Sequence, residues 1–120
     1  MKIAPLTSLV VLGFALLPGA ARAAEPAAGG AVEAESRALF EKKCAMCHGE
    51  DGKAQTKMGQ KHRIPSYVDM AWQAKQTDEK LKDAITNGVG DTKMKSWKGK
   101  LTEAEIDGLV RYVRSFDPGK

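Results

Sequence analysis

Residues 44–48 read Cys-Ala-Met-Cys-His and hold the side chains of this sequence best suited to bind a metal or a cofactor. Cys44 and Cys47 are the only two cysteines of the 120-residue chain, and one of its two histidines follows them directly. Two thiols three positions apart, next to an imidazole, fit a disulfide, part of a zinc site, a redox-active dithiol or an attachment point for a cofactor. Each of these makes a different demand on the rest of the sequence.

Three of the four interpretations find little support elsewhere in the chain. A zinc site needs four ligands, and outside the motif the sequence offers one further histidine, His62, and no second Cys-x-x-Cys pair. A thioredoxin-like dithiol would follow a strand in a βαβ unit, whereas a helical pattern precedes this motif. A plain disulfide would leave the adjacent His48 without a role.

Covalent attachment of haem accounts for all three residues together. The i, i+3 spacing places both sulfurs on one face of a helical turn, where they can add to the two vinyl groups of one porphyrin. His48, next in sequence, can then bind the iron from the proximal side. The chain also has few large apolar residues for a core, so a buried porphyrin would supply the missing apolar centre.

The residues alone leave the sixth ligand of such an iron open. Candidates are His62 and the methionines at positions 46, 58, 70 and 94. Met46 lies inside the motif and cannot reach the opposite face, and Met70 is expected to pack in the core beside Trp72. Met94 lies in a long segment between two helices, far enough along the chain to reach the other side.

The elements that must position these residues are predicted to be helices without strands. Apolar spacing predicts a first helix at residues 33–46, with Ser36, Leu39, Phe40 and Lys43 on one stripe. Asp69 is expected to cap a short helix at 70–75, and Thr77 to open another that ends at Asn87-Gly88.

The last helix has the clearest sequence signature. Thr102 and Glu105 form a capping box, and apolar residues follow at the i, i+3, i+4, i+7 spacing, namely Ile106, Leu109, Val110 and Val113. Residues 53–66 and 89–100 are predicted to be long loops.

The N-terminus predicts export. Lys2 precedes an apolar run at residues 3–17, and residues 21–23 (Ala-Arg-Ala) fit the cleavage rule of a signal peptide. The run is short of the roughly 20 residues that span a bilayer, although an uncleaved membrane anchor is the alternative. We therefore expect a signal peptide at 1–23, a flexible lead-in at 24–32, and one domain at 33–120 that resides in the periplasm without stable membrane insertion.

The charge balance argues against one class of partner. The chain has 19 Lys and Arg against 15 Asp and Glu, for a net charge of +4, and cleavage would remove Lys2 and Arg22 and leave +2. This balance does not suggest nucleic acid.

Two stretches of the sequence together resemble a known family. The pattern SxxLFxxxCAMCHGEDG at residues 36–52 resembles the N-terminal half of a class I c-type cytochrome. The patterns IxNG at 85–88, MKSW at 94–97, LTxxEI at 101–106 and LVxYV at 109–113 resemble its C-terminal half. The likeness covers residues 36–116, nearly all of the predicted mature chain.

The resemblance implies an all-α cytochrome c fold around one haem c. Cys44 and Cys47 would attach the haem through two thioethers, His48 would be the proximal ligand and Met94 the distal one. The N- and C-terminal helices would cross, with short helices and long loops around the haem. By analogy with the family, the Pro65 carbonyl is expected to accept a hydrogen bond from Nδ1 of His48.

The sequence departs from the family pattern at three positions. Lys95 follows the axial methionine in place of the usual proline, and Trp97 stands in place of the more common phenylalanine. Ser36 occupies the helix crossing, where the family usually has glycine.

A His/Met-ligated haem leaves the iron no open position, so we expect a monomeric soluble electron carrier, not an enzyme. The alternatives are a haem-based small-molecule sensor or peroxidase with a weak or absent distal ligand, and a dedicated electron-transfer subunit of a dehydrogenase. Lysines surround both halves of the site, at 42, 43, 53, 57 and 61 and at 93, 95, 98 and 100. They would either steer acidic redox proteins or simply be a solvated face.

Overall fold

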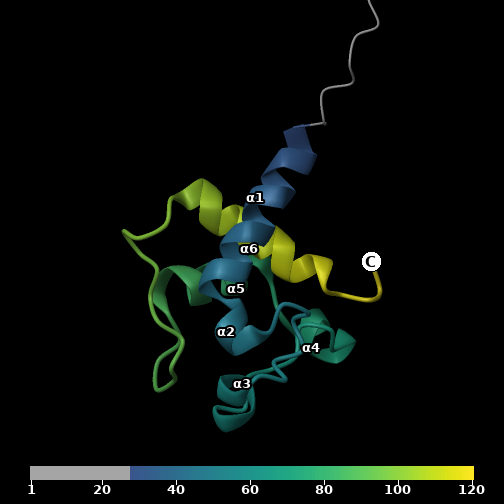
Figure 1. Cartoon of the computed structure of the whole chain (residues 1–120), viewed down its shortest axis with the longest axis vertical. Coiled ribbons are helices and arrows are strands. Elements are labelled where there is room, and N and C mark those ends of the chain that lie inside the picture. Colours follow the sequence, from purple (N-terminus) through teal and green to yellow (C-terminus); the bar gives the residue numbers. More distant parts are fainter. Residues whose placement is uncertain (1–27) are drawn as a thin grey trace, which may run out of the picture.

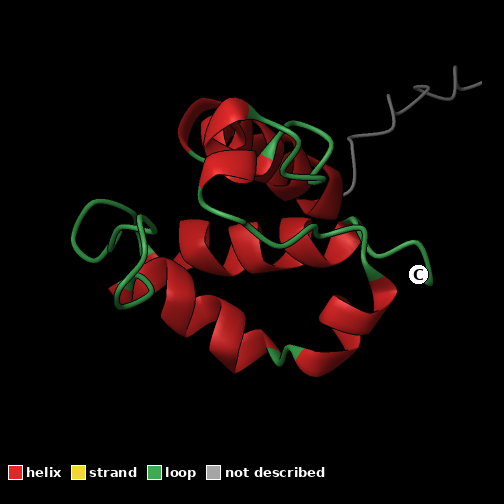
Figure 2. Ribbon diagram, turned by 90° about the horizontal axis from the view of Figure 1, so that it is seen from below, coloured by secondary structure: helices red, strands yellow, loops and turns green. Residues whose placement is uncertain are grey.

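The computed structural model describes residues 28–120, so the predicted signal peptide at 1–23 lies outside the described residues. In element order, the helices are α1 (Ala28–Lys43), α2 (Ala45–His48), α3 (Lys57–Lys61), α4 (Met70–Lys75), α5 (Asp78–Asn87) and α6 (Glu103–Ser115). Figure 2 shows helices and loops in this part of the chain, where an isolated bridge between Lys98 and Leu101 is the only β-type pairing. The all-α prediction is confirmed.

The core forms where α1 and α6 cross, with α5 packed against α6 (Figure 1). Phe40 of α1 and Leu109 of α6 are each 1% exposed, and the rings of Phe40 and Tyr112 meet edge to face with centroids 5.1 Å apart. Such aromatic pairs contribute about 0.5–1.5 kcal/mol beyond the area that they bury. The predicted crossing of the N- and C-terminal helices is confirmed.

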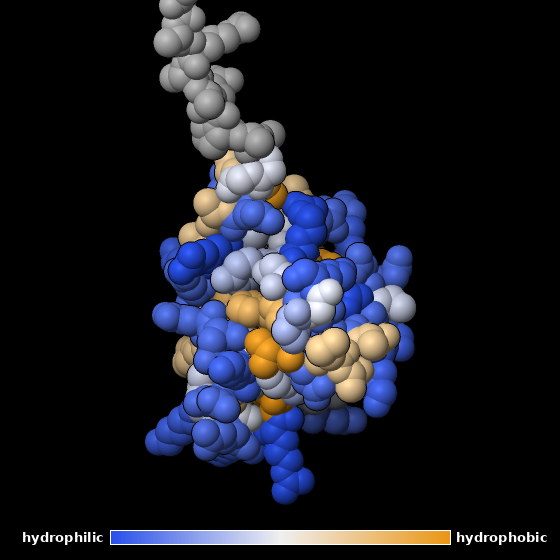
Figure 3. All heavy atoms as spheres, turned by 90° about the vertical axis from the view of Figure 1, so that its right-hand side faces the viewer, coloured by the Kyte–Doolittle hydropathy of each residue, from blue (hydrophilic) through white to orange (hydrophobic). Residues whose placement is uncertain are grey.

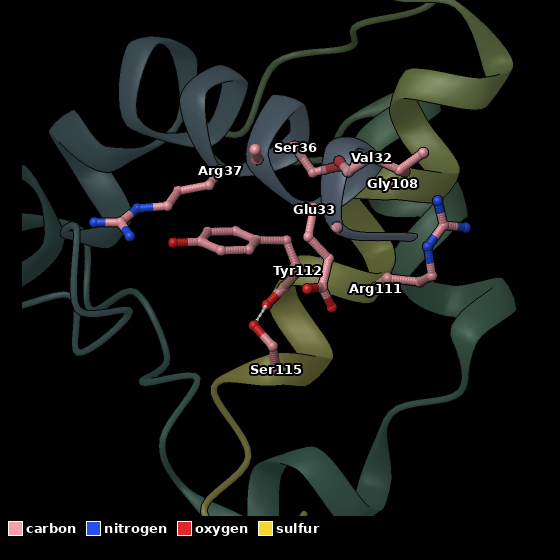
Figure 4. Close-up of a pocket in the computed structure, with 10 residues that line it drawn as sticks. Val32, Glu33, Ser36, Arg37, Gly108, Arg111, Tyr112 and Ser115 are labelled. Atoms are coloured by element: carbon pink, nitrogen blue, oxygen red, sulfur yellow. Dashed lines mark hydrogen bonds between the residues drawn. The ribbon is translucent and has the colours of Figure 1, made fainter. Parts of the chain in front are cut away.

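Two small residues allow this close approach. A Cβ atom added to Gly108 of α6 would lie 2.3 Å from the hydroxyl oxygen of Ser36 on α1. Figure 4 shows these two residues facing each other beside Tyr112, at a groove of about 360 Å³ between the helices. Ser36 is 6% exposed, and its hydroxyl donates a 2.8 Å hydrogen bond to the Val32 carbonyl one turn earlier.

The last three helices begin where their capping residues predict. Asp69 accepts bonds from two amides of α4, Thr77 caps α5, and Thr102 and Glu105 form the predicted capping box of α6. Side chains that bond the free amides of a first turn stabilise that end locally, so these helices are specified by few residues.

The first helix and the loop at 53–66 differ from the prediction. Helix α1 begins at Ala28, inside the segment 24–32 predicted as flexible, and ends at Lys43, where a turn at Cys44 separates it from α2. Helix α3 interrupts the predicted loop because Thr56 caps it and accepts a bond from the Gly59 amide. Glycine has a low helix propensity, so the pair at 29–30 and Gly59 argued against a helix in each of these two segments.

One face of the molecule is mainly hydrophilic (Figure 3). Figure 3 shows polar side chains over most of one face, with apolar residues gathered in a narrow strip. Between residues 28 and 120, no helix combines the length and hydropathy that crossing a bilayer needs.

Candidate functional site

The attachment motif is built from a single tight turn. The amides of Cys47 and His48 both donate to the Cys44 carbonyl, over 3.1 and 3.0 Å. Both cysteines are free thiols and half-buried, and Cys44 packs against the hydrophobic core. Burial, with a smaller effect of the neighbouring Cys47, raises the pKa of the Cys44 thiol to about 11.

The His48 imidazole lies within an aromatic cluster. The Tyr67 ring stacks on it, with centroids 4.8 Å apart and planes 15° from parallel, and the Phe40 ring is 6.4 Å away. Burial lowers the pKa of His48 to about 4, so the imidazole is neutral at pH 7. A neutral imidazole is the form that coordinates a metal.

The two ring nitrogens of His48 have different surroundings. Nε2 lies 3.3 Å from the Tyr67 hydroxyl, whereas Nδ1 is buried without a hydrogen-bond partner. Pro65 is exposed, and the predicted bond from Nδ1 to its carbonyl is not formed. That expectation is wrong for this structure, because the ring turns toward the Tyr67 side of the cluster.

The segment after the motif folds back against its backbone. The Thr56 hydroxyl donates a 2.7 Å bond to the Cys47 carbonyl and accepts one from the Gly59 amide over 2.8 Å. A Cβ on Gly59 would lie 2.1 Å from the Ala54 carbonyl oxygen and 2.8 Å from that of Cys47. Only glycine lets α3 approach this closely.

Among the candidate distal ligands, Met94 is the one that packs against the core. It is half-buried and, like Cys44, touches the hydrophobic cluster at the centre of the molecule. Its backbone is held on both sides, since its amide bonds to the Thr92 hydroxyl over 3.1 Å and its carbonyl to the Val89 amide over 3.2 Å. The second long segment therefore presents a thioether to the interior.

The other candidates are placed less favourably. Met46, inside the motif, is 77% exposed. Met70, which we predicted to pack in the core, is 59% exposed, because α4 instead turns Gln73 inward. His62 is half-buried at the C-terminal end of α3.

Sequence reasoning missed three residues of the site: Tyr67, Gln73 and Gly59. Tyr67 had a signal, since it is an aromatic residue in an otherwise polar stretch. Gln73 and Gly59 had none, because their roles depend on tertiary contacts with backbone carbonyls.

Basic residues gather beside this site. The ammonium groups of Lys43 and Lys100 each lie 5.9 Å from the centroid of the Trp97 ring, within range of a cation–π interaction. None of the ion pairs formed between residues 28 and 120 involves the lysines at positions 93, 95, 98 and 100.

These residues fit the haem that the sequence predicts. Two unpaired thiols lie one turn apart, and a neutral imidazole with a buried, unpartnered nitrogen follows them, facing an apolar cluster that a methionine also contacts. Across the described residues, no group of three or more His, Cys, Asp and Glu side chains could hold a metal ion.

Comparison with known proteins places this chain in a family. Residues 31–113 match the family described as cytochrome C oxidase, cbb3-type, subunit III. The chain is similar to a solved structure titled KustC0563 c-type cytochrome, with a TM-score of 0.64 and 35% sequence identity over 68% of this chain and 96% of that one.

Two curated relatives are subunits of a larger oxidase. The cbb3-type cytochrome c oxidase subunit FixP of Bradyrhizobium diazoefficiens is 30% identical over 87 residues, covering 72% of this chain and 28% of the relative. FixP of Azorhizobium caulinodans is 33% identical over 104 residues, covering 87% and 32%. The chain thus spans about three-tenths of the length of the curated relatives that it matches.

Proposed function

Because the chain belongs to the cytochrome c family and is a class I c-type cytochrome with covalently bound haem c, we propose that His48 and Met94 are its axial ligands and that Cys44 and Cys47 form its two thioethers. The observation that carries this proposal is the half-buried imidazole of His48, whose Nδ1 is buried without a hydrogen-bond partner, beside two free thiols. The function of the chain is haem-based electron transfer.

The protein residues contribute orientation and an apolar setting. When bound, haem c supplies an iron that gains one electron from a donor as Fe(III) becomes Fe(II) and returns it to an acceptor. Tyr67 stacks on the His48 ring and restricts its plane, and Phe40 adds an apolar neighbour. The Met94 thioether, a soft ligand, would favour the ferrous state and raise the reduction potential relative to a second histidine.

The partners are proposed to be redox proteins with acidic surfaces, and catalysis is proposed to reside in those partners. The unpaired lysines of segment 93–100 and the two ammonium groups beside Trp97 support this by charge complementarity. The oxidase subunits among the relatives support a partner of the oxidase class over the dehydrogenase that the sequence also allowed. We further propose that residues 1–23 are removed on export and that the protein acts as a monomer in the periplasm.

The axial ligands are tested by absorption spectra of the purified protein in both oxidation states. A low-spin spectrum with a methionine-to-iron charge-transfer band is expected, and Met94→Ala should abolish the band while Met70→Ala leaves it in place. High-spin ferric haem in the wild type, with ready binding of carbon monoxide after reduction, would instead support a sensor or a peroxidase. If the denatured protein retained no haem, the proposed thioethers would be disproved.

A further inference from the structure

Gln73 has a buried side-chain amide whose nitrogen and oxygen are both hydrogen-bonded. Its side chain is on α4 and is 2% exposed. Nε2 donates to the carbonyls of Tyr67, over 2.8 Å, and Val113, over 3.0 Å, while Oε1 accepts from Nη1 of Arg114 over 3.0 Å. Both acceptors are carbonyls and the donor is a guanidinium, so the amide has one permitted orientation.

Arg114 of α6 holds Gln73 in place from the other side. Its guanidinium also donates to the backbone carbonyls of Gln73, over 2.9 Å, and Gln76, over 2.6 Å, and to the Asp78 carboxylate over 2.7 Å. These carbonyls belong to the C-terminal end of α4, where a positive charge is favourable. Helix α4 is therefore fastened to α6 by charged hydrogen bonds, and Gln73 lies at the centre of the connection.

The connection continues from Gln73 to the proximal histidine through Tyr67. The Tyr67 backbone is bonded on both sides, since its amide donates to the Gly52 carbonyl over 2.7 Å and its carbonyl accepts from Gln73. The Tyr67 ring is 8% exposed and stacks on the His48 imidazole. A direct path of contacts thus runs from α6 through Gln73 and Tyr67 to His48.

An apolar residue of similar size would fill the position of Gln73 without needing three partners. A buried amide is costly unless it is fully bonded, and a fully bonded amide fixes geometry more strictly than packing does. Groups behind a metal ligand orient it and alter the properties of the metal that it binds.

We propose that Gln73 is a positioning residue for His48: by fixing the Tyr67 backbone it holds the tyrosine ring against the imidazole, and so sets the orientation of the proximal ligand and the reduction potential. This inference rests on the proposed ligation by His48. Gln73 acts through Tyr67 and makes no bond of its own to the imidazole.

The test uses the haem-loaded protein and measures midpoint potential by equilibrium redox titration. In Gln73→Met, the ratio of oxidised to reduced protein at a fixed applied potential is expected to change at least threefold from wild type. In a Tyr67→Ala background the same substitution should change the ratio by much less, because the residue through which Gln73 acts is gone. Thr102→Ala is the control, since it removes a helix cap far from Tyr67 and should lower stability without changing the potential.

Two results would overturn the inference. One is a potential in Gln73→Met no more altered than in Thr102→Ala, and the other is an undiminished shift in the Tyr67→Ala background. If Gln73→Met yields no haem-loaded protein, Gln73→Glu replaces it, because a carboxylate keeps the bond from Arg114 and loses both bonds to carbonyls. If His48→Ala left the absorption spectrum the same as in the wild type, the proposed ligation itself would be refuted. If His48 proved to be a ligand but the midpoint potential of the Gln73 variants equalled that of the wild type, this inference alone would be refuted.

Discussion

At His48, packing and electrostatics favour the same state of one side chain. Stacking on Tyr67 restricts rotation of the ring, and burial disfavours the imidazolium, so a single neutral ring is presented. Under the proposed ligation, neighbouring side chains alone hold the His48 imidazole in the neutral form that binds a metal. The residues that do so come from α1, from the motif and from the segment before α4.

Gly59 gives a residue-scale prediction about the segment behind the motif. Gly59→Ala should destabilise the protein by about 1–3 kcal/mol, the usual range for overpacking, because the new Cβ would collide with the carbonyls of Ala54 and Cys47. Chemical denaturation measures the change, and the yield of covalently bound haem should fall with it.

Gly90 provides the matched control for that substitution. A Cβ added there meets nothing within 4 Å, so Gly90→Ala should leave stability nearly unchanged. Equal stabilities for the Gly59 and Gly90 variants would show that the contact between α3 and the motif backbone can relax freely.

The residues predicted from the sequence were those whose chemistry is local. Cys44, Cys47 and His48 lie within a stretch of five residues, and their spacing alone indicates haem attachment. Met94 required the family resemblance, since four methionines and His62 were open by residue type. Gln73 was out of reach, because its partners on α6 lie about forty positions away and a polar residue on a short helix predicts exposure.

At the element scale, the crossing of α1 and α6 depends on one hydroxyl and one missing side chain. We predict that Gly108→Ala destabilises the protein by about 1–3 kcal/mol, because its Cβ would lie 2.3 Å from Oγ of Ser36. Adding Ser36→Gly should recover most of that loss by removing the hydroxyl. Thermal unfolding of the two single variants and the double variant checks this, and strictly additive losses would contradict it.

The capping box of α6 gives a second prediction at this scale. Thr102→Ala should cost about 1 kcal/mol of stability, because the Glu105 amide loses its partner at the helix N-terminus. Glu105→Ala should cost less when Thr102 is already alanine, since the two side chains cap one turn reciprocally. Chemical denaturation of the three variants measures the coupling, and full additivity would mean that the two caps act independently.

Helices were predicted well where caps specify them and poorly where glycine interrupts them. Helices α4, α5 and α6 are capped at their N-termini by Asp69, Thr77 and Thr102, as expected. Helix α3 contains Gly59, which weakens any propensity-based prediction, and it forms because the motif backbone offers it a partner. The formation of α3 therefore depends on a tertiary contact and not on local helix propensity.

Across the whole molecule, charge is distributed unevenly although the net charge is small. Segment 93–100 carries four lysines, and Lys43 joins it at the end of α1. Acidic residues instead accompany α5 and α6, where Asp78, Glu103 and Asp107 are engaged in ion pairs. The charges on α5 and α6 are thus partly neutralised by ion pairs, whereas, within the described residues, segment 93–100 and Lys43 form an unpaired cationic region on the same domain.

This asymmetry predicts how the protein meets its partners. Lys43→Glu with Lys100→Glu should slow electron transfer to an acidic redox protein several-fold at low salt, because both ammonium groups lie beside Trp97 on the unpaired cationic region. Stopped-flow rates across a series of ionic strengths measure this, and the wild-type rate should fall as salt screens the attraction.

The matched control is Lys75→Glu with Lys120→Glu. It changes the net charge by the same amount, but on α4 and at the C-terminus, across the molecule from segment 93–100 in Figure 1. If both pairs slowed the reaction alike, net charge alone would govern the encounter, and a rate independent of salt would refute steering altogether. A loss confined to the first pair would locate the docking surface at Trp97, next to the segment that carries Met94.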